Sequence, residues 1–310
     1  MKYIWNTTDF HLQNTAVSLG KFDGFHVGHR LLIEYVTSLK EKGYQAVTFS
    51  FFQHPGNFVS NEMSRKLIYT EAEKVGKAEE LGSDYFISYP FNEEVMHTEP
   101  EDFVRSVLVE RLGAKVVVVG KDYHFGRNRE GNVAVLEELG KKYGFEVMAF
   151  DKVVLDGEEV SSTRIRNDLM EGNMDKANEM LGAPYSITGE VVYGNQIGRT
   201  LGMPTANIIP APEKLVPPNG VYASRIHIDD SLYYGITNIG YKPTVGGEHE
   251  KGVETFIFDF SESIYGKEIQ VEFYAFERGE QKFGSLDELK KQMERDCQFG
   301  KEYFQRFQNV

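Results

Sequence analysis

The chain has 310 residues, enough for two domains, and 41% of them are hydrophobic, enough for each domain to bury a core. Its formal net charge of −13, from 34 basic and 47 acidic residues, gives no global attraction to a nucleic-acid backbone or an anionic membrane, so any cations that bind anionic substrates must be local. The single cysteine, Cys297, excludes an intramolecular disulfide and a cysteine-rich zinc site.

The first half of the sequence alternates strand-like and helix-like segments. Apolar runs predict strands at 15–20, 44–52, 84–89, 114–120 and 145–150. Amphipathic patterns predict helices at 29–43, 70–81, 100–112, 132–143, 162–171 and 174–182. Strands separated by helices indicate a parallel sheet with crossover connections, which is a doubly wound α/β domain.

The pattern changes at Tyr185, after which the segments are short, β-rich and separated by turn residues. Six or so such segments follow without helices between them, which predicts an antiparallel barrel or sandwich. A final helix is predicted over 285–307, with Ser285 as N-cap and Glu288 at the capping-box spacing. We therefore expect two domains, residues 1–183 and 184–310.

The stretch "SLGKFDGFHVGH" (18–29) lies between the first of these strands and the first helix. Ligands bind at the carboxyl ends of strands in open α/β sheets, and free N–H groups at a helix start favour anions. The spacing is not the G-x-G-x-x-G of dinucleotide sites and lacks the Walker A lysine. His26 and His29 could donate hydrogen bonds to a transferring phosphoryl group. The alternative is a tight turn with two surface histidines.

Two stretches of the first half resemble signatures of the nucleotidyltransferase superfamily. "GKFDGFHVGH" resembles its H-x-G-H element, and "SSTRIR" (161–166) resembles its I-S-S-T-x-I-R element. The segment 116–131 resembles the one that follows a central strand in this superfamily. The resemblance implies catalytic roles for His26 and His29. It also implies ATP and phosphate binding by Gly20, Phe22, Asp23, Gly24, Gly28, Asp122, Ser161, Ser162, Thr163 and Arg166.

A structural alternative exists for "SSTRIR", in which a serine is only an N-cap and the arginines are solvated. "FFQHPGNF" (51–58) resembles the F-x-x-H-P segment of bacterial FAD synthetases. That resemblance implies FMN binding by His54 and Pro55, while a purely structural role for His54 stays open.

"GNQIGRTLGMPTANI" (194–208) looks like a Walker A loop, but it is one residue short and has arginine in place of lysine. Because a Walker A loop joins a strand to a helix and this region is β-rich, we reject that interpretation. "GRTLGMPTAN" resembles the G-R-x-L-G-x-P-T-A-N signature of riboflavin kinase, with Met203 where phenylalanine is common. The resemblance implies ATP binding by Gly198, Arg199, Gly202, Pro204, Thr205 and Asn207, with Thr205 and Asn207 also holding Mg²⁺.

Later segments, including "TNIGYKPTVGG" (237–247) and "GVETFIFDF" (252–260), resemble further blocks of the riboflavin kinase family. Glu254 stands where that family places its catalytic base, although on spacing alone it would be a strand carboxylate facing solvent. The whole chain is thus similar to the bifunctional bacterial riboflavin kinase/FMN adenylyltransferase family. That similarity implies a nucleotidyltransferase domain, an antiparallel β-barrel with a terminal helix, and the substrates riboflavin, FMN and ATP with Mg²⁺.

Two other functions share part of this pattern. An adenylyltransferase acting on phosphopantetheine or nicotinamide mononucleotide would share the N-terminal motifs but not the C-terminal signature. A flavin-binding regulatory module without chemistry would not need the histidines, Thr205, Asn207 and Glu254. The sequence begins without a signal-peptide pattern and has no apolar run of the roughly 20 residues that a membrane helix needs. We expect a cytoplasmic protein without nucleic-acid or membrane partners, and its oligomeric state stays open.

Overall fold

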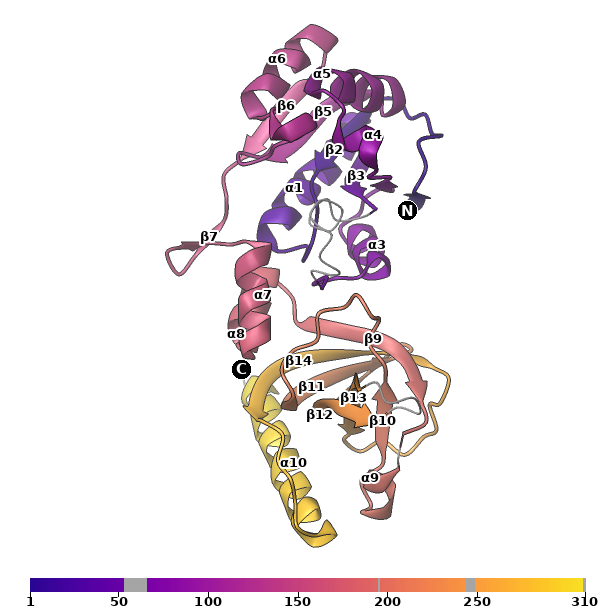
Figure 1. Cartoon of the computed structure of the whole chain (residues 1–310), viewed down its shortest axis with the longest axis vertical. Coiled ribbons are helices and arrows are strands. Elements are labelled where there is room, and N and C mark those ends of the chain that lie inside the picture. Colours follow the sequence, from indigo (N-terminus) through magenta and orange to yellow (C-terminus); the bar gives the residue numbers. More distant parts are fainter. Residues whose placement is uncertain (53–65, 195, 244–248, 309–310) are drawn as a thin grey trace. The chain divides into compact units, whose positions relative to one another are not determined.

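The computed structural model describes the backbone at residues 1–52, 66–194, 196–243 and 249–308. Its internal contacts divide the chain into two compact units, residues 1–162 and 163–310, and each is described by itself. Figure 1 shows a sheet flanked by helices in the first unit and a barrel with a long helix in the second. Among the described residues, we find no helix that combines the length and the apolar character of a membrane span.

The main sheet of the first unit is parallel, with the strand order β1-β4-β3-β2-β5-β6. The strands are β1 (Lys2–Trp5), β2 (Thr15–Leu19), β3 (Gln45–Phe51), β4 (Tyr85–Tyr89), β5 (Ala114–Gly120) and β6 (Glu146–Phe150). The five strands predicted from apolar runs are confirmed. Strand β1 is not predicted from the sequence, since only Ile4 of this short edge strand is buried and no apolar run marks it. A small hairpin of β7 (Val154–Leu155) and β8 (Glu158–Glu159) is likewise not predicted.

Helices cover both faces of this sheet. They are α1 (Val27–Ser38), η1 (Leu39–Lys42), α3 (Glu71–Glu80), α4 (Glu93–Met96), α5 (Pro100–Phe103), η2 (Val104–Arg111), η3 (Arg127–Arg129) and α6 (Val133–Tyr143). Leu32 and Val36 of α1 share a core with Val118 of β5. Leu136 of α6 belongs to a second core with Val117, which points to the opposite face because strand side chains alternate. The predicted doubly wound α/β fold is confirmed.

Two predicted helices differ in detail from the structure. The segment 100–112 is not one α-helix, because η2 is a π-helix whose hydrogen bonds span five residues, as from Leu112 N to Val107 O at 2.9 Å. The helix predicted over 29–43 begins earlier, at Val27, because His26 caps it. It then continues after Ser38 as the 3-10 turn η1.

The direction of the connections reverses at the centre of the sheet. From β2 the chain proceeds to β3 and β4 on one side, whereas β5 and β6 lie on the other side of β2. The loops that follow β2 and β5 therefore diverge at the carboxyl edge of the sheet, where open α/β sheets bind their ligands. The first of these loops carries His26 and the second carries Asp122.

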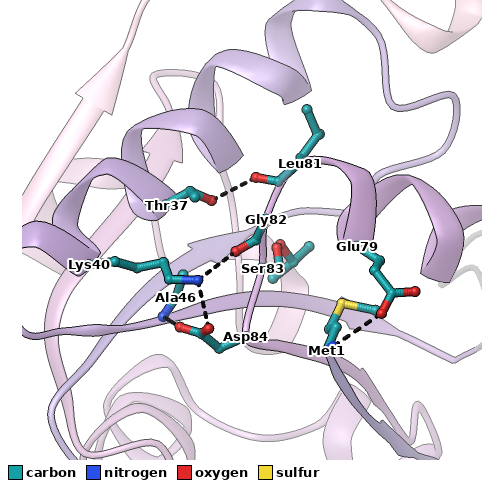
Figure 2. Close-up of polar contacts among 10 residues, drawn as sticks. Met1, Thr37, Lys40, Ala46, Glu79, Leu81, Gly82, Ser83 and Asp84 are labelled. Atoms are coloured by element: carbon teal, nitrogen blue, oxygen red, sulfur yellow. Dashed lines mark hydrogen bonds and ion pairs between the residues drawn. The ribbon is translucent and has the colours of Figure 1, made fainter.

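Polar contacts fasten the end of α3 beside α1 and η1 (Figure 2). Thr37 Oγ1 donates a hydrogen bond to the Leu81 carbonyl at 3.0 Å. Lys40 Nζ donates to the Gly82 carbonyl at 3.1 Å and to the Asp84 carboxylate at 2.7 Å. These bonds link two helices that follow successive strands, so α1 and α3 lie side by side on one face of the sheet.

The second unit contains a closed antiparallel barrel with the strand order β10-β13-β12-β11-β14-β9. The strands are β9 (Tyr185–Val192), β10 (Thr205–Ile208), β11 (Gly220–Ile228), β12 (Ser231–Pro243), β13 (His249–Ile257) and β14 (Glu268–Arg278). Tyr222 and Phe273 are fully buried and their rings meet edge to face. A hydrogen bond of 2.8 Å joins the buried hydroxyls of Thr237 and Thr255. The predicted barrel is confirmed.

The helices of this unit are α7 (Ser162–Glu171), α8 (Met174–Leu181), α9 (Ile197–Thr200) and α10 (Leu286–Gln308). Helix α10 lies along β11 and β12, where Cys297 packs with Val221, Ile236 and Phe258 (Figure 1). The Ser285 cap is confirmed, since its Oγ accepts a hydrogen bond from Glu288 N at 3.2 Å.

Helix α8 packs against β9 and β14 of the barrel. Its Asn178 side chain accepts a hydrogen bond from Tyr185 N at 2.7 Å and donates one to the Phe273 carbonyl at 2.8 Å. Met174 and Met180 of the same helix are buried. The contacts therefore place the helix within the second unit, and the functional boundary at 183/184 stays a prediction.

We expect a fragment of residues 163–310 to be more stable than a fragment of residues 185–310. The shorter fragment loses both Asn178 hydrogen bonds, at about 1 kcal/mol each, and uncovers apolar barrel surface, for a total on the order of 3 kcal/mol. Urea unfolding followed by circular dichroism measures the difference. Equal midpoints for the two fragments would show that α8 does not support the barrel.

Candidate functional site

The loop between β2 and α1 is held by two aromatic side chains in unusual backbone conformations. Phe22 and Phe25 both lie in the left-handed region, with φ of 46° and 41°, and both are buried. Such conformations are strained for bulky residues and occur most often at functional sites. Gly24 between them has φ of 100°, which a residue with a side chain rarely adopts. The backbone of this loop is therefore strained directly before the start of α1.

His26 and His29 form a stacked pair at this helix start. Their ring centroids lie 3.7 Å apart with an interplanar angle of 17°. His26 is the N-cap of α1, and its Nδ1 accepts a hydrogen bond from His29 N at 3.4 Å. Phe22 meets His29 edge to face, with the centroids 5.2 Å apart. The Nδ1 atom of His29 is buried and has no hydrogen-bond partner among the described residues.

This environment keeps both imidazoles neutral. Burial lowers the pKa of His26 to about 4, although the Asp23 and Asp122 carboxylates act in the opposite direction. Burial also lowers the pKa of His29 well below its usual range, and the neighbouring His26 and Lys74 add to the effect. A neutral imidazole can still donate one hydrogen bond from a ring nitrogen. The pair is therefore suited to binding anionic oxygens and not to supplying positive charge.

The remaining predicted residues of the first unit surround this pair. Asp23 is buried, and its Oδ1 accepts a hydrogen bond from Ile68 N at 3.0 Å. Ser162 Oγ donates to the Asp23 carbonyl, so the two signatures of this unit meet although 139 residues separate them. Asp122, on the loop after β5, is exposed and lies 3.3 Å from Lys152 Nζ.

The other residues predicted for the first site lie in several elements. Thr163 and Arg166 belong to α7, which is described with the second unit, and the Arg166 side chain is buried. Ser161 precedes α7 and is half-buried. Gly20 and Gly28 flank the loop, and the rings of Phe22 and His26 lie against them. His54 and Pro55 lie outside the described residues.

A second group of polar side chains lies on one face of the barrel wall. Thr205 and Asn207 of β10 share this face because they are two residues apart. In the strand register Asn207 lies opposite Glu254 of β13, and Glu254 lies opposite Asn238 of β12. The Thr205 hydroxyl donates a hydrogen bond of 2.5 Å to Glu254 Oε1. Glu254 is half-buried and hydrogen-bonded, unlike a strand carboxylate that faces bulk solvent.

Asn238 also faces this group and is not predicted from the sequence, although it lies in the stretch "TNIGYKPTVGG". Its position opposite Glu254 depends on the pairing of β12 with β13, which no local pattern reveals. The predicted loop residues lie before β10. Gly198 is buried in the short helix α9, Arg199 is exposed, and Gly202 and Pro204 connect α9 to the strand.

Oxygen atoms dominate the barrel site. Among the described residues, no group of three or more His, Cys, Asp or Glu side chains is arranged to hold a metal ion. Thr205, Asn207 and Glu254 instead offer a hydroxyl, an amide and a carboxylate on neighbouring strands. The backbone comes close to them at Gly194, where a Cβ atom would lie 2.7 Å from Asn207 Cγ. A hard cation that keeps water and phosphate oxygens as ligands needs few protein groups of this kind.

Two family models match successive parts of the chain. The model described as FAD synthetase matches residues 9–164, and the model described as riboflavin kinase matches residues 181–304. Curated relatives match nearly the whole chain, and each is named as a bifunctional riboflavin kinase/FMN adenylyltransferase. The protein of Buchnera aphidicola subsp. Schizaphis graminum is 35% identical, with 94% of each chain covered. Those of Bacillus subtilis and Escherichia coli are 33% identical, with 96–98% of each chain covered.

A solved structure also resembles the whole chain. A crystal structure described as a macrolide-efflux protein from Streptococcus pneumoniae superposes with a TM-score of 0.85 at 29% sequence identity. The match covers 95% of this chain and 97% of that one. A chain of this fold therefore also occurs among solved structures.

We expect the His26 imidazole to stay neutral down to about pH 5, as its lowered pKa of about 4 requires. Because its pKa in the unfolded chain is about 6.5, stability from the neutral ring is fully present above that pH and declines as the pH falls toward 4. Long-range ¹H–¹⁵N NMR of the ring nitrogens measures this, with the spectrum of His26→Gln as assignment control. Protonation near pH 6.5 would contradict the desolvated pair.

Proposed function

Because the chain belongs to the bifunctional riboflavin kinase/FMN adenylyltransferase family, we propose that its two units divide two successive reactions between them. The barrel phosphorylates riboflavin with ATP to give FMN. The parallel-sheet unit, extended to about residue 183, transfers AMP from a second ATP to FMN, giving FAD and pyrophosphate. The observation that carries this division is that the two matched segments coincide with two differently built folds.

Glu254 is the general base of the kinase reaction in this proposal. The 5′-hydroxyl oxygen of riboflavin attacks the γ-phosphorus of ATP, the bond to the β,γ-bridging oxygen breaks, and ADP leaves. A primary hydroxyl is a poor nucleophile, so a carboxylate within hydrogen-bond reach accepts its proton. The Thr205 hydroxyl fixes the orientation of that carboxylate through the 2.5 Å hydrogen bond. Asn238 is a further candidate contact to the reacting groups.

Thr205 and Asn207 would hold Mg²⁺, since a hydroxyl and an amide oxygen suit a hard cation that is also bound by ATP phosphates. At Gly194 a side chain would collide with Asn207, since a Cβ atom there would lie 2.7 Å from Asn207 Cγ. When bound, the ion neutralises phosphate charge and favours in-line geometry. Gly198, Arg199, Gly202 and Pro204 form the loop that covers the nucleotide.

The adenylyl transfer needs no base. A phosphate oxygen of FMN, already an anion at neutral pH, attacks the α-phosphorus of ATP, the bond to the α,β-bridging oxygen breaks, and pyrophosphate leaves. Catalysis consists of positioning and of stabilising charge on the phosphates. His26, His29 and the N–H groups at the start of α1 supply hydrogen bonds, with Asp122, Ser161, Ser162, Thr163 and Arg166 as further nucleotide contacts. His54 and Pro55 contact FMN in this proposal, and the chain works in the cytoplasm, where ATP is present.

Incubation with riboflavin, ATP and Mg²⁺ tests the proposal directly. Chromatographic separation of the flavins is expected to show FMN first and FAD later. Riboflavin that stays unchanged would contradict the kinase assignment. FMN without FAD would contradict the adenylyltransferase assignment, and FAD formed only from supplied FMN would contradict the role of the barrel.

We expect Glu254→Gln to lower the rate of riboflavin phosphorylation by about 10²–10⁴-fold, because the amide keeps the shape of the side chain but cannot accept the proton. FAD synthesis from supplied FMN is expected to continue at the parent rate. Steady-state rates with each flavin measure both effects. Glu190→Gln, on an exposed position of β9, is the matched control. Near-normal phosphorylation in the Glu254 variant would exclude the carboxylate as base.

We expect His29→Ala to lower FAD synthesis from FMN on the order of 10²–10³-fold, as for other donors to a developing oxyanion. The loss should fall mainly on kcat, because the hydrogen bond strengthens in the transition state. Riboflavin phosphorylation is expected to be unchanged, since His29 lies in the other unit. His97→Ala, at an exposed position of the first unit, is the control. FAD synthesis within a few-fold of the parent rate would show that His29 has only a structural role.

A further inference from the structure

Helix α3 carries a buried ammonium group that has no role in the proposed mechanism. Lys74, one turn into α3, is only 5% exposed. Its Nζ atom donates a hydrogen bond of 3.3 Å to Glu71 Oε2, its one hydrogen-bond partner in the described part of the chain. An ammonium carries three N–H donors, and lysine is almost never buried without a specific partner. A buried charge with so few partners indicates a function beyond packing.

Glu71 holds this ammonium in place, and side chains of two strands hold the Glu71 carboxylate. Its Oε1 atom accepts hydrogen bonds from Ser88 Oγ of β4 and from Tyr3 Oη of β1, the latter at 3.1 Å. The carboxylate also helps to raise the pKa of Tyr3, although burial is the larger cause. Two strands of the sheet thus hold the carboxylate, and the carboxylate binds Lys74.

The same helix is docked onto the catalytic loop. Ile68, just before α3, donates its N–H to Asp23 Oδ1 at 3.0 Å, and its Cδ1 lies 3.2 Å from the place of a Cβ on Gly24. At their other ends α1 and α3 are joined by the contacts of Figure 2. The first turns of the two helices therefore lie beside one another, with His29 on one and Lys74 on the other.

We propose that Lys74 is a positioning residue for adenylyl transfer, which acts on His29 through its buried charge and is itself held by Glu71. This inference rests on the proposed function of the His26–His29 loop. With Lys74 charged, His29 stays a neutral hydrogen-bond donor toward the phosphates. The positive potential in the site then comes from the Lys74 ammonium and not from an imidazole. The charged and titratable groups that act on the pair are Lys74, Asp23, Asp122 and the two imidazoles themselves.

Three variants test the effect of this charge. We expect Lys74→Met to raise the pKa of the His29 imidazole, and with it the acid limb of FAD synthesis from FMN, by about one pH unit. Lys74→Arg keeps the charge and should retain the parent values. Lys77→Met, on the same helix, removes a lysine that stacks over Tyr69 and should change neither quantity. Ring ¹H–¹⁵N NMR gives the pKa, and kcat measured against pH gives the acid limb.

Lys74→Met leaves the Glu71 carboxylate without its ammonium partner, and this could prevent the protein from folding. A double variant keeps the test valid in that case. Lys74→Met with Glu71→Gln removes both charges together, and glutamine can still accept from Ser88 and Tyr3. It should raise the His29 pKa by less than Lys74→Met does, because loss of the Glu71 carboxylate acts in the opposite direction. An unchanged His29 pKa in the neutral variants would overturn the proposal. That NMR result does not depend on turnover, whereas failure of the proposed function would appear as absence of FAD from the parent protein.

Discussion

The conformation of the loop between β2 and α1 depends on one constraint, the desolvation of the stacked His26–His29 pair. Phe22 and Phe25 accept left-handed backbone conformations, at a cost of about 1–3 kcal/mol each. In these conformations the Phe22 ring meets His29 edge to face, and the Phe25 ring contacts Phe22. Phe25 in turn contacts Phe86 of β4, which connects the loop with the sheet. Burial of two aromatic side chains offsets a cost of this size. The strain is therefore tolerated because the core extends up to the site.

The barrel site depends on a different constraint, the register of three neighbouring strands. Glu254 meets Asn207 on one side and Asn238 on the other only in the observed pairing. A slip of one residue would turn Glu254 to the opposite face, where the buried Thr237–Thr255 hydrogen bond now lies. That interior pair therefore helps to fix which side chains share a face with Glu254. The first site is defined by a strained loop, and the second by a regular ladder.

Much of this architecture is predictable because its signals are local. The apolar run at 114–120 and the glycine-histidine loop before a helical pattern each specify one element, and the structure has them in place. Lys74 could not be found this way, since a glutamate and a lysine three residues apart on a helix usually mark a solvated face. Asn238 depends on strand pairing, and α8 depends on which core covers its apolar side. These features follow from contacts between distant segments.

The distribution of charge explains how an acidic chain can act on highly anionic substrates. Lys121 and Arg127, near the carboxyl edge of the sheet, form surface ion pairs with Asp151 and Glu99. Such pairs contribute little and are screened by salt, so these cations can exchange their partners for phosphates at small cost. A buried ammonium such as Lys74 is screened far less and keeps its effect at physiological ionic strength. Local N–H donors and the field of a buried cation can therefore favour phosphates although the net charge of −13 opposes them.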